Sequence, residues 1–236
     1  MKIVVFTGSG VSAESGIATF RGSGGLWAEY RIVDVCTPQA LAKDREKVIK
    51  FYNMRRREIL SKEPNIAHKT ISRLEEYFDV EVVTQNIDDL HERAGSKKVT
   101  HLHGEIVKLR SSTDESAVVP IVGWEQNVNE RHEDGSLLRP FVVFFGEAVP
   151  MLEKAIDIVS KADIFLVVGT SLEVYPAASL VNYLKPGVPV YVVDPEAPYL
   201  KLKSNPVNYI REKASEAMPL LMEELKKYKD DISGDN

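Results

Sequence analysis

The chain reads Ile3-Val4-Val5-Phe6-Thr7-Gly8-Ser9-Gly10-Val11-Ser12-Ala13 near its start. The first four residues are an unbroken apolar run and, with Thr7, are rich in β-branched side chains, which is typical of a strand buried on both faces. The next six have the form Gly-x-Gly-x-x-Ala, in which glycines permit a tight turn and a close approach of pyrophosphate to the backbone. Free N–H groups at the start of a following helix favour the same anion. The stretch therefore predicts a strand, phosphate loop and helix for nucleotide binding.

This pattern alone does not define an ordinary hydride-transferring dinucleotide enzyme. Glycines after a first strand are also common turn residues. The acidic residue expected at the end of a second strand is missing, because Glu29 lies in Gly-Leu-Trp-Ala-Glu-Tyr, which does not resemble a strand. A different use of the nucleotide is therefore predicted.

Other strand-like runs alternate with helical patterns along the chain. Strands are expected at 80–84, 164–169 and 188–194, and helices at 45–60, 68–77, 151–161 and 212–226. This alternation predicts an α/β, Rossmann-like doubly wound parallel sheet. Residues 33–63 and 106–140 fit it poorly and are interpreted as two insertions that form one small lobe. The large lobe of this single catalytic domain, residues 1–236, would comprise about 1–32, 64–105 and 141–236, with a frayed tail after Lys226.

Composition excludes several classes of protein. The 236 residues are 44% hydrophobic and carry a net charge of -5, which provides a sizeable core and argues against nonspecific nucleic-acid binding. Apolar runs stop far short of the roughly 20 residues needed to span a bilayer. No signal peptide is visible before the first strand, so we expect a cytoplasmic protein with neither membrane nor specific nucleic-acid partners. The single cysteine, Cys36, can form neither an internal disulfide nor a four-thiolate zinc site.

A longer set of motifs is far more specific. The first loop continues as Glu14-Ser15-Gly16-Ile17-Ala18-Thr19-Phe20-Arg21-Gly22. In order along the chain follow Gly25-Leu26-Trp27, Thr84-Gln85-Asn86-Ile87-Asp88, His101-Leu102-His103-Gly104, Phe145-Gly146-Glu147 and Gly169-Thr170-Ser171-Leu172, with Val174 and Pro176. Together they closely resemble the sirtuins, the NAD-dependent protein lysine deacylases. The resemblance covers essentially the whole chain except residues 108–138.

The resemblance implies that NAD is consumed as a co-substrate. In that family the acyl oxygen of a modified lysine attacks the ribose carbon that bears nicotinamide, and nicotinamide and 2'-O-acyl-ADP-ribose are released. His103 matches the general base, and a neutral imidazole suits proton removal near neutral pH. His101 is the nearest competitor, but the motif places the base directly before Gly104. A packing role at a strand end is the alternative for His103.

The resemblance also implies the other site residues. Asn86 is expected to assist catalysis. The expected cofactor-binding residues are Gly8, Ser9, Gly10, Ala13, Glu14, Phe20, Arg21, Trp27, Gln85, Asn86, Ile87, Asp88, Gly169, Thr170, Ser171, Asp194 and Ala214. Those expected to bind the acylated-lysine peptide are Tyr52, Arg55, Val143, Phe145, Gly146 and Glu147. Structural alternatives stay open for Asp88 as a helix cap, for Phe20 in core packing, and for residues 142–145 as only a buried strand. Asp194 departs from the pattern, because the family commonly has asparagine there.

The chain departs from the family between its His-Gly and Phe-Gly-Glu motifs. Most sirtuins carry two cysteine pairs of a zinc ribbon there, whereas this chain has none, and Ser111 stands about where the first is expected. His132 with scattered carboxylates does not make a credible tetrahedral site. We therefore expect no metal, and an insertion held instead by packing through Val118, Val119, Ile121, Val122 and Trp124.

A pair of residues, Tyr52 and Arg55, indicates which acyl group is removed from lysine. Tyr52 and Arg55 lie three residues apart on an expected helix and so share a face, whereas Arg56 and Arg57 turn away. The pair matches the Tyr-x-x-Arg motif of sirtuins that prefer succinyl, malonyl or glutaryl lysine. The prediction is a deacylase that removes succinyl or malonyl as well as acetyl groups. The alternative for Arg55-Arg56-Arg57 is a basic run at the surface. The alternatives to a deacylase are a mono-ADP-ribosyltransferase and a noncatalytic NAD or ADP-ribose sensor.

Overall fold

The large lobe is built on a six-stranded parallel sheet in the order β3-β2-β1-β7-β8-β9. The computed structural model describes residues 1–19 and 30–234. The strands are β1 (Lys2–Thr7), β2 (Asp79–Thr84), β3 (Val99–His101), β7 (Ile164–Val168), β8 (Val190–Val193) and β9 (Val207–Ile210). Chain order reverses beside β1, which pairs with β2 on one side and β7 on the other. The predicted doubly wound α/β fold is confirmed.

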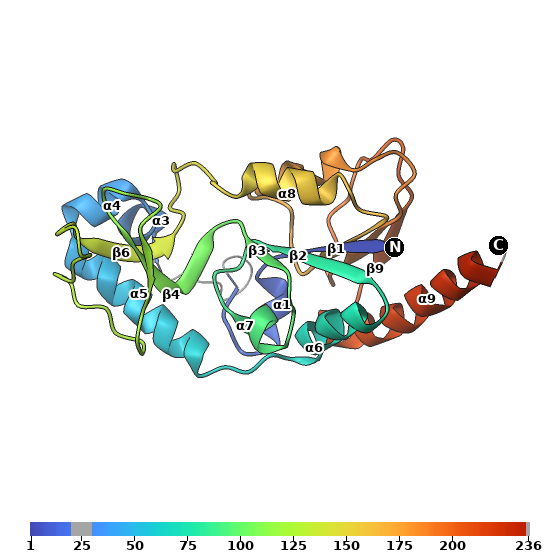
Figure 1. The fold of residues 1–236 in the computed structure, drawn as a ribbon, viewed down its shortest axis with the longest axis horizontal. Helices are drawn as coiled ribbons and strands as arrows, with labels where there is room; N and C mark the ends of the chain where they lie inside the picture. Colours follow the sequence, from blue (N-terminus) through green and yellow to red (C-terminus); the bar gives the residue numbers. More distant parts are fainter. Residues whose placement is uncertain (20–29, 235–236) are drawn as a thin grey trace.

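Each face of this sheet carries its own helices and its own core. Ile3 and Val5 of β1 pack with α6 (Ile66–Arg73), η1 (Leu74–Glu76) and α9 (Ala214–Gly234). The alternate residues Val4 and Phe6 pack with α8 (Leu152–Val159) and η2 (Ala177–Tyr183) on the other face. Figure 1 shows α8 on one side of the sheet and α6 with α9 on the other. The two short helices α1 (Gly10–Ala13) and α7 (Leu90–Arg93) follow β1 and β2.

The small lobe lies at one end of the molecule (Figure 1) and contains an antiparallel sheet in the order β5-β4-β6. Its strands are β4 (Gly104–Ser111), β5 (Val118–Pro120) and β6 (Leu138–Val142), and its helices are α3 (Ile32–Val35), α4 (Pro38–Lys43) and α5 (Arg45–Leu60). Asp44 caps α5 by accepting a hydrogen bond from the Lys47 N–H, at 3.0 Å. The limits of the two lobes stay a prediction.

Polar side chains of α5 hold the part of the insertion 106–140 that follows β5. Arg56 is fully buried and donates from Nε to the Ile106 carbonyl at 2.6 Å and from Nη1 to the Trp124 carbonyl at 2.9 Å. Asn53 binds both backbone groups of Gln126, each at 2.9 Å. Arg45 donates from Nε to the Val128 carbonyl at 2.7 Å. These bonds satisfy the backbone of a segment with little regular structure.

The expectation that apolar packing holds this insertion is wrong. Val122 is 96% exposed and Trp124 38% exposed, while Val118, Val119 and Ile121 are only half-buried. The strand β5 has three residues and lies at the edge of its sheet, so it contributes few side chains to any packing. Hydrogen bonds from α5 supply the attachment that side-chain packing does not.

The expectation of a frayed tail after Lys226 is wrong, because α9 continues to Gly234. The short strands β3 and β9 of the large sheet were not predicted. Within the part of the chain that the structure describes, no helix combines the length and apolar character needed to cross a membrane.

Candidate active site

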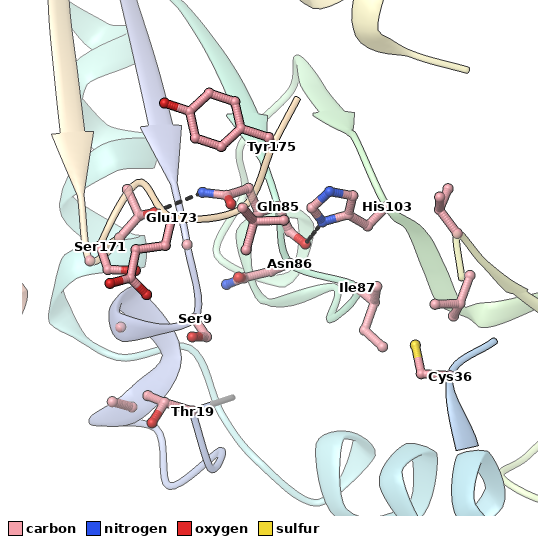
Figure 2. A pocket seen from close by; sticks show the side chains of 18 of the residues that line it. Ser9, Thr19, Cys36, Gln85, Asn86, Ile87, His103, Ser171, Glu173 and Tyr175 are labelled. Atoms are coloured by element: carbon pink, nitrogen blue, oxygen red, sulfur yellow. Dashed lines mark hydrogen bonds between the residues drawn. The ribbon is translucent and has the colours of Figure 1, made fainter. Parts of the chain in front are cut away.

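A cavity of about 890 Å³ opens at the carboxyl ends of β1, β2, β7 and β8 and extends to α5 and the segment after β6. The carboxyl ends of parallel strands meet at one edge of a sheet, and ligands bind where the strand order reverses. Figure 2 shows Ser9 and Ser171 on one side of this cavity, Cys36 on the opposite side, and Asn86 and His103 between them. The site thus joins the two lobes.

The loop after β1 is packed tightly against the loop after β7. A Cβ on Gly10 would lie 2.8 Å from both Cα and the carbonyl oxygen of Gly169, and a Cβ on Gly8 would lie 2.6 Å from Thr170 Cβ. Gly169 itself has φ +62°, and a Cβ there would meet the Val11 nitrogen at 2.2 Å. Glycines are therefore required here because the two loops pack against each other too closely for a side chain. The sequence pattern had suggested a tight turn and the approach of a pyrophosphate, but not this contact between loops.

His103 lies between β3 and β4 and faces the cavity (Figure 2). Its Nδ1 is 2.9 Å from the Gln85 carbonyl oxygen. A carbonyl only accepts, so Nδ1 carries the proton and Nε2 keeps its lone pair. Burial lowers the pKa of His103, and the hydrogen bond to Gln85 offsets only part of this effect. The imidazole is therefore neutral at neutral pH and able to accept a proton.

The segment after β2 supplies the next lining residues, Gln85, Asn86 and Ile87. Gln85 donates from Nε2 to Thr170 Oγ1 at 2.9 Å, which ties the ends of β2 and β7 together (Figure 2). Asn86 is 3% exposed, and its Nδ2 donates to Ser12 Oγ at 3.1 Å. The side chain is thus held in a fixed orientation at the cavity wall.

Asp88 is the one predicted cofactor residue within the described chain that does not line the cavity. Its Oδ2 accepts from Ser12 Oγ at 3.1 Å, and its Oδ1 accepts from the Leu90 N–H at 3.2 Å, at the start of α7. Burial raises the pKa of Asp88 more than these hydrogen bonds lower it. The bond to Leu90 ties Asp88 to the first turn of α7, whose N-cap residue is Asp89, and through Ser12 the carboxyl group also helps to fix Asn86. A contact of Asp88 with the cofactor stays a prediction.

The remaining predicted cofactor residues divide into two groups. Ser9, Ala13, Glu14, Thr170, Ser171, Asp194 and Ala214 all line the cavity. Glu14 accepts from both the N–H and the hydroxyl of Ser215, so it also fixes the first turn of α9. Asp194 accepts from the Glu196 N–H at 2.8 Å, and burial raises its pKa. Phe20, Arg21 and Trp27 lie outside the described residues.

The predicted peptide segment forms the cavity wall after β6. Val143, Phe145, Gly146 and Glu147 line it, and Phe145 is 39% exposed. Glu147 pairs with Arg139 at 2.6 Å and accepts from the Phe144 N–H at 2.7 Å. Although burial raises the pKa of Glu147, the hydrogen bond and charge of Arg139 lower it overall, so the group is ionised. Its role in the structure is to anchor this segment.

Tyr52 and Arg55 both reach the same cavity from α5. Both are buried, and the Tyr52 hydroxyl donates to Cys36 Sγ at 3.2 Å. Arg55 pairs through Nη1 with Glu58 at 2.5 Å. The helical spacing therefore places a phenol and a guanidinium on one wall of the cavity, as predicted. The carboxylate of Glu58 lies beside this guanidinium.

Sequence reasoning missed several lining residues. Cys36, Glu173, Tyr175, Pro195 and Lys213 line the cavity. Tyr175 lies between Val174 and Pro176 of the motif that follows β7, and this position in the sequence was a usable signal. Cys36 and Lys213 carried no signal, because each reaches the cavity only through the packing of its own loop.

Fold and site together define an α/β protein of the nucleotide-binding type, with a half-buried, neutral histidine in the cavity at the carboxyl edge of its sheet. A family model described as "Sir2 family" matches residues 8–176, and the chain belongs to this family. It is 54% identical over 192 residues to the NAD-dependent protein deacylase of Aggregatibacter actinomycetemcomitans, covering 81% of this chain and 92% of the relative. It is 47% identical to that of Bacteroides thetaiotaomicron, over 95% and 96%.

Solved structures agree over the whole fold. A Sir2 homologue in complex with NAD shares 40% of the sequence with a TM-score of 0.85, over 96% of this chain and 90% of the homologue. A Sir2 complex with p53 peptide and NAD+ shares 32% with a TM-score of 0.77, over 94% and 92%. The fold and the family are therefore established by sequence and structure alike.

Proposed function

We infer that this chain is an NAD-dependent protein deacylase that acts on acylated lysines of proteins or peptides. The observation that carries the inference is His103, whose Nε2 is left unprotonated and faces the same cavity as the phosphate loop. The relatives named as NAD-dependent protein deacylases support it. NAD supplies the electrophilic ribose carbon, so the protein needs no nucleophile of its own.

Each group of lining residues has a task in this reaction. The loop from Gly8 to Gly10 would hold the cofactor phosphates at the cavity wall. The N–H groups of Gly8 and Gly10 themselves donate to the Val168 and Gly169 carbonyls and so fix the shape of the loop. His103 would accept the proton of a ribose hydroxyl at Nε2 while Gln85 keeps Nδ1 protonated. The segment from Val143 to Phe145 would bind the extended peptide through its backbone, a sequence-tolerant mode of recognition.

A direct assay tests the function against its alternatives. The protein is incubated with NAD and acetyl-, malonyl- and succinyl-lysine peptides, and all products are measured by mass spectrometry. Nicotinamide with acyl-ADP-ribose identifies a deacylase. ADP-ribose attached to a protein side chain identifies a mono-ADP-ribosyltransferase, and binding of NAD with no product from any peptide identifies a sensor.

We further propose that the preferred acyl group is a short dicarboxylic one, succinyl or malonyl. The support is the position of Tyr52 and Arg55 on the cavity wall. A guanidinium offers five N–H donors, and the ion pair with Glu58 occupies only part of them. A guanidinium with an adjacent phenol is suited to a carboxylate at the end of a short chain.

Arg55→Met should lower kcat/KM for succinyl-lysine peptide by about 1.5 to 3 kcal/mol in transition-state terms, because a charge-assisted hydrogen bond is lost. Turnover of acetyl-lysine peptide should change little. Glu58→Gln is the matched variant: removing the competing carboxylate should leave succinyl turnover equal or higher. Equal losses on both peptides for Arg55→Met would show that the residue supports the fold, and the acidic-acyl proposal would be withdrawn.

We also propose that the enzyme works without structural zinc. In the position of the family's ribbon, Ser111 Oγ lies 2.7 Å from Ser136 Oγ and 3.1 Å from Thr113 Oγ1, and it accepts from the Asp114 N–H. Such hydroxyls do not fit a tetrahedral thiolate site. Residues 1–19 and 30–234 contain no group of three His, Cys, Asp or Glu placed to hold a metal.

Chelator-treated protein should therefore keep its melting temperature and its turnover within experimental error. Elemental analysis of the purified chain is the measurement. One tightly held zinc per chain, with unfolding on its removal, would refute the proposal.

A further inference from the structure

His101, the last residue of β3, bridges two elements behind the cavity. The residue is 8% exposed. Its Nδ1 lies 2.8 Å from the Asn86 carbonyl oxygen, and its Nε2 lies 2.8 Å from Glu92 Oε1 of α7. Both partners are acceptors only, when Glu92 is ionised. A neutral imidazole has one N–H, so only the imidazolium donates to both.

The charges around His101 favour that form. Glu92 and His91 face it from α7, Asp88 from the segment before α7, and Glu105 from β4. Burial lowers the pKa of His101, but the hydrogen bond and charge of Glu92 and the bond to Asn86 outweigh it, so the pKa is raised. His101 in turn lowers the pKa of Glu92 against the effect of burial. Both pKa shifts therefore act in the direction that favours the ionic pair, in agreement with the two hydrogen bonds of the ring.

The two histidines of the motif contact consecutive carbonyls of one loop. His103 binds the Gln85 carbonyl and His101 binds the Asn86 carbonyl. We propose that His101 is a positioning residue that ties Glu92 to the Asn86 carbonyl and so holds Gln85, Asn86 and Ile87 against the cavity. The inference rests on the proposed deacylase function, whose base and cavity wall depend on that loop.

This arrangement has a consequence for the pH dependence of turnover. His103 must be neutral, so kcat/KM falls as pH drops through its lowered pKa. His101 must be charged, so kcat/KM also falls as pH rises through its raised pKa, when one nitrogen is left facing an oxygen without a proton. The two histidines set opposite limbs of one bell-shaped profile.

The test compares Glu92→Gln with Glu105→Gln, using NAD and acetyl-lysine peptide over a range of pH. Glu92→Gln should move the alkaline limb down by about one pH unit, because the charge-assisted bond is lost. Glu105→Gln removes an equal charge without a hydrogen bond to His101 and should move it by less than about 0.3 unit. His101→Gln should lower kcat/KM about 10- to 100-fold through misplacement of the loop.

Imidazole signals in NMR titrations give a readout independent of activity, and the chain has only five histidines to assign. The signal of His101 should titrate above the ordinary 6.5 in the wild type and lower in Glu92→Gln. An unmoved alkaline limb in folded Glu92→Gln, or a His101 that titrates below 6.5, would overturn the inference. A wild type that releases no nicotinamide would instead overturn the proposed function, while the titration still reports on His101.

Discussion

His103→Ala should lose about 10²- to 10⁴-fold in kcat for acyl-lysine peptides while keeping its affinity for NAD. The substitution removes the proton acceptor, and the contacts among the phosphate loop, Gly169 and Thr170 stay intact. The Gln85 carbonyl that loses its donor lies beside the open cavity, where water can replace the imidazole. Steady-state kinetics and calorimetric titration with NAD measure the two properties separately.

The control for this variant is His132→Ala, which removes a half-buried histidine of the insertion, remote in sequence from every motif. Its turnover should match the wild type. If His103→Ala retained near-normal turnover, the residue would be eliminated as the base. If it lost NAD binding in parallel, the imidazole would be a binding group and the assignment of a proton-transfer role would fail.

Arg56→Met should lower the free energy of unfolding by about 3 kcal/mol. Removal of the guanidinium leaves the Ile106 and Trp124 carbonyls without donors, at about 1 to 3 kcal/mol for each buried group. Part of that loss is returned, because Arg56 is fully buried without a carboxylate in an ion pair and its own desolvation is costly. Burial lowers the pKa of Arg56 to about 10, which leaves it charged at neutral pH.

Urea denaturation of Arg56→Met and Arg57→Met provides the measurement. Arg57 is exposed and stacks over the Trp124 ring at 5.3 Å, so its loss should cost no more than about 1 kcal/mol. If Arg56→Met were more stable than the wild type, the desolvation cost of the guanidinium would exceed the gain from its three hydrogen bonds, to Ile106, Trp124 and Asn53 Oδ1.

The sequence predicted those parts of the fold that depend on local pattern. The limits of α5, Arg45–Leu60, agree with the expected ones, because Asp44 caps its start and apolar residues recur from Val48 to Leu60 on either side of the charged run 55–58. The strand β3 was missed because three residues are too few to show a period. The contact of Gly10 with Gly169 was missed for a similar reason, since it joins residues far apart in the chain.

The run Arg55-Arg56-Arg57 shows where sequence reasoning reaches its limit. A rotation of about 100° per residue separated Arg55 from its neighbours correctly. It could not reveal that Arg56 meets an insertion, whereas Arg57 stays at the surface. Asp88 was likewise assigned to the cavity because the motif gives its order in the chain but not the hydrogen bond to Leu90 that turns it inward.

The helix α5 both lines the cavity and holds the insertion in place, so the small lobe cannot be exchanged as a separate module. On one face of α5, Tyr52 and Arg55 reach the cavity, and on another, Asn53 and Arg56 hold residues 124–126. An insertion of different backbone shape would leave two buried polar side chains without partners. A working chimera must therefore exchange residues 106–140 together with α5, and with that helix it also exchanges one wall of the cavity.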